Sequence, residues 1–269
     1  MIEKQDKILV CPACKYTPLN SIVEDGVIIY TCEDCGWQKL ERNYFYLTSW
    51  DVEIRQALAP IDIIHSIFTD GDVVDFLKPR LQGVSHISHC QDMPDGYIFG
   101  EVNIAYQIYL RQMVVLATTY AELILKDFFR CLFIAQPLRM NPYLARDGSG
   151  KATIPLNTIL QAGTKEELLL TLTEHASSLA VGGQLHKVVE KIIKECKLKL
   201  DKPITTDLRE VVDLRNRIVH EGKKEELQLD CIHKSFGLLR YLLYVLGQAA
   251  VEYQIPYLDD CGLLLEFAN

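Results

Sequence analysis

Three polar residues with the chemistry of acid–base catalysis occur close together in the last third of the chain: Arg215, Asn216 and His220. A histidine transfers protons near neutral pH, and an arginine guanidinium stabilises negative charge through paired N–H donors. Asn216 and His220 are four positions apart, so a helix places them on one face, with Arg215 one step around. We therefore predict a site in which His220 moves a proton, Arg215 holds an anion and Asn216 orients either His220 or the anion.

The same three residues also have a structural explanation. Polar side chains are common at the end of an amphipathic helix, and a histidine near a helix C-terminus is stabilising by itself. The carbonyl charge there favours the imidazolium, which predicts an acid role or a phosphate-binding role for His220. Arg215 shares a face with Val211 and Ile218, and a buried charge needs a reason, which is either functional or structural.

The helix that must carry these residues has recognisable ends. Asp207 followed by Glu210 is suited to cap its N-terminus, and Gly222 stands where a left-handed residue would end it. The residues between them form an apolar face at helical spacing, made of Val211, Leu214 and Ile218. An amphipathic helix of this kind presents its polar end to a site while its apolar face packs on a core.

Further helical patterns precede and follow this segment. Residues 101–136 contain no proline or glycine and are apolar nearly all round, which predicts one long buried helix or two in line. Residues 164–182 begin with a capping box and end at a glycine pair, and another helix follows from Gln184. The last long helix is expected over about residues 225–253. These helices predict an all-α bundle.

Four cysteines near the N-terminus have the spacing of zinc ligands. Cys11 and Cys14 form one C-P-x-C pair, and Cys32 and Cys35 form a C-x-x-C pair after 17 intervening residues. Each pair brings two thiolates together in a tight turn, and four sulfurs complete a closed tetrahedral shell that suits Zn²⁺. Because such a shell has no open position for water, we expect the zinc ion to be structural.

The residues between the cysteine pairs favour a β-hairpin. Segments 21–23 and 27–30 are β-prone, and the Asp-Gly at residues 25–26 is a good tight turn. The module resembles a zinc ribbon, with Gly36 after the second pair but Lys15 where the first pair often has glycine. Its acidic balance disfavours phosphate binding. The zinc ion either replaces a core too small to fold alone or supports contact with a protein partner or substrate.

The segment around Arg215 resembles the motif of the HEPN superfamily, whose ribonuclease members carry Arg, a polar residue that is commonly Asn, and then His near a helix end. Residues 119–129 are also similar to the helix that precedes the motif helix in HEPN domains, and the resemblance covers about residues 100–255. It implies a metal-independent endoribonuclease with Arg215, Asn216 and His220 as catalytic residues. It also implies a homodimer in which two motif helices meet around a scissile phosphate of RNA.

The resemblance leaves two functions open. In the first, the chain is an RNA-cleaving effector of the toxin or antiviral-defence kind, which leaves cyclic phosphate and 5′-hydroxyl ends. In the second, the bundle is a non-catalytic module that binds a nucleotide, RNA or a protein partner, and the ribbon is a docking surface. A basic stripe at helical spacing faces either solvent or a polyanion, and it consists of Lys187, Lys191 and Lys194.

Changes in composition along the sequence divide the chain into three parts. We expect a zinc ribbon over residues 1–46, an acidic connector of short helices and loops over 47–100, and the helical bundle over 101–269. The expected fold class is therefore mainly α, a HEPN-like helical bundle preceded by a small β zinc ribbon.

Charge and composition limit the partners and the cellular location that we expect. With 28 Lys and Arg against 36 Asp and Glu, the formal charge is -8, which disfavours general coating by nucleic acid and allows only a local basic groove. The first ten residues lack the apolar run of a secretory signal, and residues 241–251 are too short to span a bilayer. We therefore expect a cytoplasmic protein without membrane contact, and reduced thiols. Four further cysteines are expected to be small core residues: Cys131, Cys196, Cys231 and Cys261.

Overall fold

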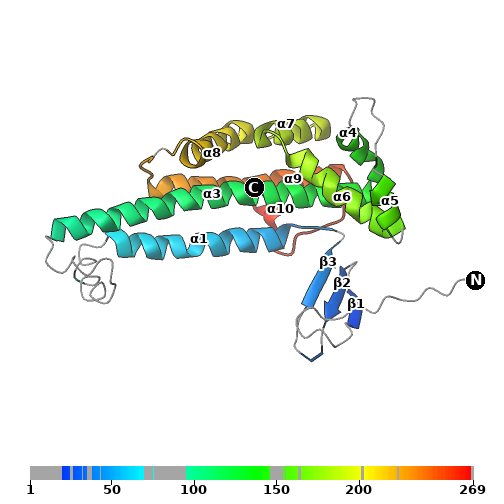
Figure 1. Cartoon of the computed structure of the whole chain (residues 1–269), viewed down its shortest axis with the longest axis horizontal. Coiled ribbons are helices and arrows are strands. Elements are labelled where there is room, and N and C mark those ends of the chain that lie inside the picture. Colours follow the sequence, from blue (N-terminus) through cyan, green and yellow to red (C-terminus); the bar gives the residue numbers. More distant parts are fainter. Residues whose placement is uncertain are drawn as a thin grey trace, which may run out of the picture.

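The computed structural model of the chain is mainly helical (Figure 1), so the predicted class is confirmed at that level. Its central element is α3 (Asp95–Ala135), a single helix of 41 residues that contains most of the long apolar segment. The structure describes residues 20–24, 27–31, 33–34, 38–42, 44–69, 75, 95–145, 154, 156–162, 165–200, 203–222 and 224–267.

The bundle is built around α3. Four α-helices pack directly against it, and a fifth, α7, packs on three of these four. The helices α7 and α8 lie end to end along one side of the bundle, and α1 lies along another (Figure 1). The bounds are α1 (Leu47–Thr69), α6 (Lys165–Val181), α7 (Leu185–Cys196), α8 (Ile204–Val219) and α9 (Leu229–Glu252).

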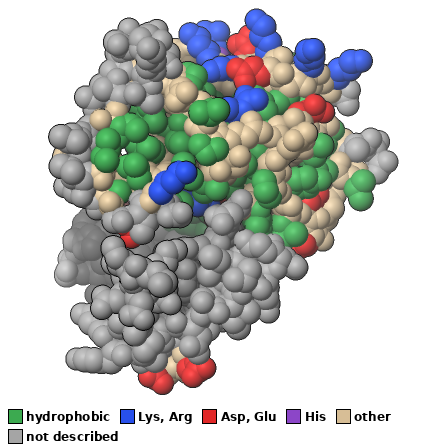
Figure 2. Space-filling view, turned by 90° about the vertical axis from the view of Figure 1, so that its right-hand side faces the viewer, with side chains coloured by type: hydrophobic (Ala, Val, Ile, Leu, Met, Phe, Trp, Pro, Cys, Tyr) green, Lys and Arg blue, Asp and Glu red, His purple; other side chains and the backbone are tan. Residues whose placement is uncertain are grey.

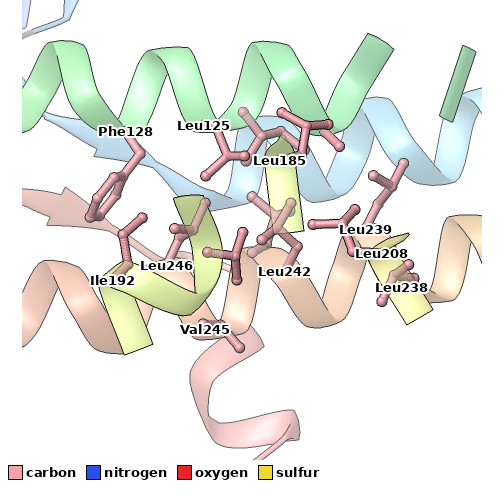
Figure 3. Packing of buried hydrophobic residues seen from close by; sticks show 14 of the residues in the cluster. Leu125, Phe128, Leu185, Ile192, Leu208, Leu238, Leu239, Leu242, Val245 and Leu246 are labelled. Carbon is pink, nitrogen blue, oxygen red and sulfur yellow. The ribbon is translucent and has the colours of Figure 1, made fainter. Parts of the chain in front are cut away.

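Part of the core lies where α3, α7, α8 and α9 meet (Figure 3). Phe128 of α3 and Leu242 of α9 are fully buried, and Leu208 brings the first half of α8 into the same cluster. Burial of one such side chain contributes about 1.5–3 kcal/mol, so the long helices are stabilised mainly by packing. An edge-on contact between the rings of Phe45 and Phe128, 5.5 Å apart, joins the chain just before α1 to this core.

The α1 helix differs from the expected connector of short helices and loops. It has 23 residues and buries Leu47, Ile54 and Ile61 against α3 and α9, so it belongs to the bundle. Its Asp51 is 2% exposed and lies 2.6 Å from the guanidinium of Arg240 on α9. The sequence hid this role because Pro60 interrupts the segment, whereas the helix continues through it.

The C-terminal segment returns to the start of α1. Strand β4 (Phe45–Tyr46) pairs in parallel with β5 (Tyr257–Leu258), and α10 (Leu263–Glu266) packs on α9. Gly247 makes this close approach possible, because a Cβ atom there would lie 2.6 Å from Cδ2 of Leu264. At the C-terminal end of α3 the chain forms η2 (Pro137–Met140), α4 (Asn141–Leu144) and α5 (Leu156–Gln161).

A three-stranded antiparallel sheet precedes the bundle. Its strands are β1 (Asn20–Glu24), β2 (Val27–Thr31) and β3 (Gln38–Arg42), in the order β1-β2-β3. Glu24 pairs with Val27, so β1 and β2 form the hairpin that the Asp-Gly at residues 25–26 predicts. The sequence did not single out β3, which pairs along its whole length with β2.

Several helix ends differ from the expected positions. The N-cap of α8 is Pro203, and the helix begins at Ile204. Asp207 and Glu210 therefore lie inside the helix and do not cap it as predicted. Asp207 instead adds a negative charge in the first turn, where the helix dipole favours it. Similarly, α9 begins at Leu229 and not near Glu225. Gly222 does have the predicted left-handed backbone, with φ +61°.

Within α3, the stretch Gly100–Ala135 is long enough and apolar enough to cross a membrane. The buried residues of this stretch, including Leu110, Ile124 and Phe128, form part of the bundle core.

Candidate functional site

The end of α8 brings together all three residues of the Arg-Asn-x3-His motif. Nη1 of Arg215 lies 2.9 Å from Nε2 of His220 and donates a hydrogen bond of 3.2 Å to Oδ1 of Asn216. The backbone N–H of His220 donates to the carbonyl of Asn216 at 2.9 Å, which places the imidazole one turn beyond the amide. The sequence spacing therefore yields a compact cluster at the C-terminus of the helix.

The contact between Arg215 and His220 indicates which ring nitrogen of His220 carries the proton. A guanidinium can only donate hydrogen bonds, so Nε2 of His220 accepts and carries a lone pair in this arrangement. The ring proton then resides on Nδ1. This pattern suits a proton acceptor, whereas the helix C-terminus alone predicts the charged, donating form.

The cluster is accessible to a large substrate. His220 is exposed, and Arg215 and Asn216 are half-buried. Arg215 therefore has less burial than its position beside Val211 and Ile218 predicts, because both of these residues are also only half-buried. Both bonds of Arg215 to the cluster come from Nη1, so the Nε and Nη2 edge of the guanidinium is the edge that can grip an anion in a fork.

The segment after the motif is fastened to the central helix by residues that the sequence did not indicate. The side-chain amide of Gln107 donates to the carbonyl of Leu227 at 3.0 Å and accepts from its N–H at 2.8 Å. Arg111 donates to the carbonyl of Glu225 at 3.1 Å, and Nε of Arg217 lies 2.9 Å from the Glu225 carboxylate. The Arg217 contact is local enough to be guessed, but the α3 contacts span more than a hundred residues.

The predicted basic stripe lies on α7. Lys187, Lys191 and Lys194 are all exposed, as expected for a charged helix face. Lys191 is partly compensated, because its ammonium lies 3.8 Å from Glu195 and over the ring of Tyr143. Lys and Arg side chains gather along the upper edge of the face in Figure 2. The α7 stripe stands at the opposite end of α8 from the motif (Figure 1).

The predicted zinc ligands Cys11, Cys14, Cys32 and Cys35 lie outside the described residues. The described β1–β2 hairpin lies between the two cysteine pairs, and β3 follows the second pair. This arrangement and the four-thiolate donor set fit a structural zinc ion. Among the described residues, no group of three or more His, Cys, Asp or Glu side chains is placed to hold a metal ion.

The other cysteines mostly follow the prediction of small core residues. Cys131 and Cys196 are buried, and Cys231 is half-buried. Burial raises the pKa of the thiols of Cys196 and Cys231, which keeps them protonated and unreactive. Cys261 is exposed, so the prediction is wrong for this residue. It lies in the turn between β5 and α10, outside the core.

Compared with known proteins, the chain matches no family model, no curated protein and no solved structure.

Proposed function

We propose that the protein is a metal-independent endoribonuclease that acts through Arg215, Asn216 and His220. The observation that carries this proposal is the 2.9 Å contact between Nη1 of Arg215 and Nε2 of His220, at an exposed helix end. It places a charge-stabilising donor beside a proton acceptor, and these are the two groups that RNA cleavage without a metal requires.

In the proposed reaction, the ribose 2′-hydroxyl takes the place of Nη1 of Arg215 at Nε2 of His220, and the lone pair released there accepts the hydroxyl proton. The 2′-oxygen then attacks the adjacent phosphorus, and the bond from phosphorus to the 5′-oxygen breaks. The Nε and Nη2 edge of Arg215 stabilises the charge on the phosphate oxygens, while Asn216 holds the guanidinium in place. The leaving 5′-oxygen takes a proton from an acid, a role that His220 of a second subunit would fill in a homodimer.

The products are a 2′,3′-cyclic phosphate and a 5′-hydroxyl. DNA lacks the 2′-hydroxyl and is not a substrate. A cytoplasmic effector of the toxin or antiviral-defence kind fits this activity, because cleavage of cellular RNA stops growth. The N-terminal module contributes as a zinc ribbon, in which the ion replaces a hydrophobic core and supports contact with a protein partner.

A second candidate is a non-catalytic HEPN-like module that binds a nucleotide, RNA or a protein partner. One observation favours it: Arg215, Asn216 and His220 bond to one another, so the three residues would also make a satisfied end for α8 without any substrate.

The deciding experiment incubates purified full-length protein in EDTA with a defined RNA and, in parallel, with DNA of the same sequence. Wild type, Arg215→Ala and His220→Ala are compared with Arg209→Ala, which removes an exposed arginine from the same helix. We expect cyclic phosphate ends from wild type and Arg209→Ala only. Full cleavage by His220→Ala contradicts the proposal, as does loss of wild-type cleavage in EDTA while the protein retains its zinc.

Zinc content tests the ribbon separately. Metal analysis of freshly purified protein is expected to give about one zinc ion per chain, because four thiolates fill one tetrahedral shell. A Cys11→Ser and Cys32→Ser double variant should lose the zinc. A zinc content near zero in the wild type rules out the ribbon.

A further inference from the structure

A wide groove lies between α8 and α9, on a face that the proposed reaction does not use. It has a volume of about 1110 Å³. The groove exists because α8 packs more extensively on α3 and α7 than on α9. Its apolar lining consists of Val211, Leu214, Leu238, Tyr241 and Phe267, together with Leu227 and Cys231.

The walls of the groove are regular helix faces. Glu210 and Val211 lie three and four positions after Asp207, and Leu214 lies four and three positions after them, so the four residues form one stripe along α8. Cys231, Lys234, Leu238 and Tyr241 form the matching stripe along α9. The α8 stripe from Asp207 to Leu214 is about 10 Å long at the rise of an α-helix. Two facing helix stripes with an apolar floor have the form of a cradle for a third helix.

The rim of this groove is acidic. Its carboxylates are Asp207, Glu210, Asp213, Glu226, Asp230 and Glu266, and its cations are Arg217, Lys234 and Arg240. Charges of both signs on this rim are already paired, because Arg240 bonds to Asp51 and Glu266, and Asp213 lies 3.7 Å from Arg209. Arg217 is bonded to Glu225. The groove therefore has a surplus of negative charge that a bound partner must match.

This charge selects among possible occupants. RNA is disfavoured, because its phosphates would meet the carboxylates of the rim. A symmetric second copy is also disfavoured, because a two-fold interface at this face would set the acidic rim of one subunit against the same rim of the other. A cationic segment with apolar residues along one side satisfies both the rim and the floor.

We infer that the α8–α9 groove is the docking site for a basic amphipathic helix of a partner protein. The apolar side of that helix contacts Leu214, Leu238 and Tyr241, and its Lys and Arg residues meet Glu210 and Asp230 on the two walls. The same helix α8 carries Arg215 and Asn216, so a partner bound here lies on the element that presents the motif. The inference does not depend on whether the motif is catalytic.

The test uses the full-length protein and three fluorescein-labelled 18-residue probes. The first is an amphipathic helix of Leu and Lys, the second replaces every Lys with Glu, and the third keeps the Lys but replaces Leu with Ser. Binding is measured by fluorescence anisotropy at physiological ionic strength. Wild type is compared with a Glu210→Lys and Asp230→Lys double variant. The matched control is Glu101→Lys with Glu122→Lys, which reverses two exposed carboxylates on α3.

We expect only the Leu-Lys probe to bind, with affinity reduced about tenfold or more in the groove variant and unchanged in the α3 control. Equal weakening in both variants overturns the inference, because it shows attraction to net charge alone. Equal binding of the Ser-Lys probe overturns it as well, since the apolar floor would then be irrelevant. Sedimentation of the free proteins provides the last check: a groove variant with a changed oligomeric state would show that a second copy occupies the groove.

Discussion

The side-chain amide of Gln107 forms two hydrogen bonds with the backbone of Leu227, one from each of its polar ends, at 3.0 and 2.8 Å. This pair connects the central helix α3 with the segment that follows His220. The Arg111 bond to the Glu225 carbonyl, one helical turn along α3, strengthens the same attachment. The motif is therefore held from two directions, by the helix that precedes it and by the fastened segment that follows it.

Replacing Gln107 with Leu is expected to lower the free energy of unfolding by about 1–2 kcal/mol, because Leu227 loses both partners in a half-buried setting. Cleavage of RNA should fall as well, since the segment that follows the motif becomes less restrained. Urea unfolding and the cleavage assay measure the two effects. Gln112→Leu is the matched control, because this glutamine is exposed on the same helix. An equal effect of both substitutions would contradict a specific role for Gln107.

Replacing Arg215 with Lys tests the guanidinium itself. Lysine keeps the positive charge but cannot hold His220 and Asn216 while it grips a phosphate in a fork. We expect RNA cleavage to fall about a hundredfold with little change in stability. Arg209→Lys, on the same helix, should leave the rate unchanged. Near-normal cleavage by Arg215→Lys would show that only the charge is needed.

The buried carboxylate of Asp51 makes Arg240 important for stability. Burial lowers the pKa of Arg240, but hydrogen bonds to Glu266 and Asp51 outweigh that effect and raise the pKa overall. Arg240→Met leaves the carboxylate of Asp51, which is 2% exposed, with Arg55 as its remaining partner at 2.7 Å, and should lower the free energy of unfolding by about 2 kcal/mol. Arg55→Met removes the other partner of Asp51 and should cost less, about 1 kcal/mol, because the Arg55 side chain is 56% exposed. Similar unfolding midpoints for both variants would contradict this ranking.

Two glycines in α9 are expected to respond to alanine with opposite sign. A Cβ at Gly247 would meet Leu264 at 2.6 Å and Leu47 at 3.0 Å, so Gly247→Ala should destabilise the protein by about 1–2 kcal/mol. A Cβ at Gly237 meets no atom within 4 Å, so Gly237→Ala should stabilise it by up to about 1 kcal/mol through helix propensity. Thermal unfolding of the two variants measures both. Adding Leu264→Ala to Gly247→Ala should recover part of the loss if the clash is its cause.

The sequence by itself determined the features that depend on local spacing. An uninterrupted apolar segment predicts the long helix α3, and the four-residue interval between Asn216 and His220 places both at one helix end. The Asp-Gly pair likewise predicts the β1–β2 hairpin. These features need only the geometry of a helix turn or of a two-residue loop, which nearby residues define.

Only the tertiary structure decided which distant surfaces meet. The joining of Gln107 to Leu227, the inclusion of α1 in the core and the groove beside α8 depend on how whole helices pack. The direct contact of Arg215 with His220 also depends on side-chain orientation, which spacing leaves open. An amphipathic pattern specifies that a face is buried but does not specify its partner, because many apolar faces can satisfy the same hydrophobic requirement.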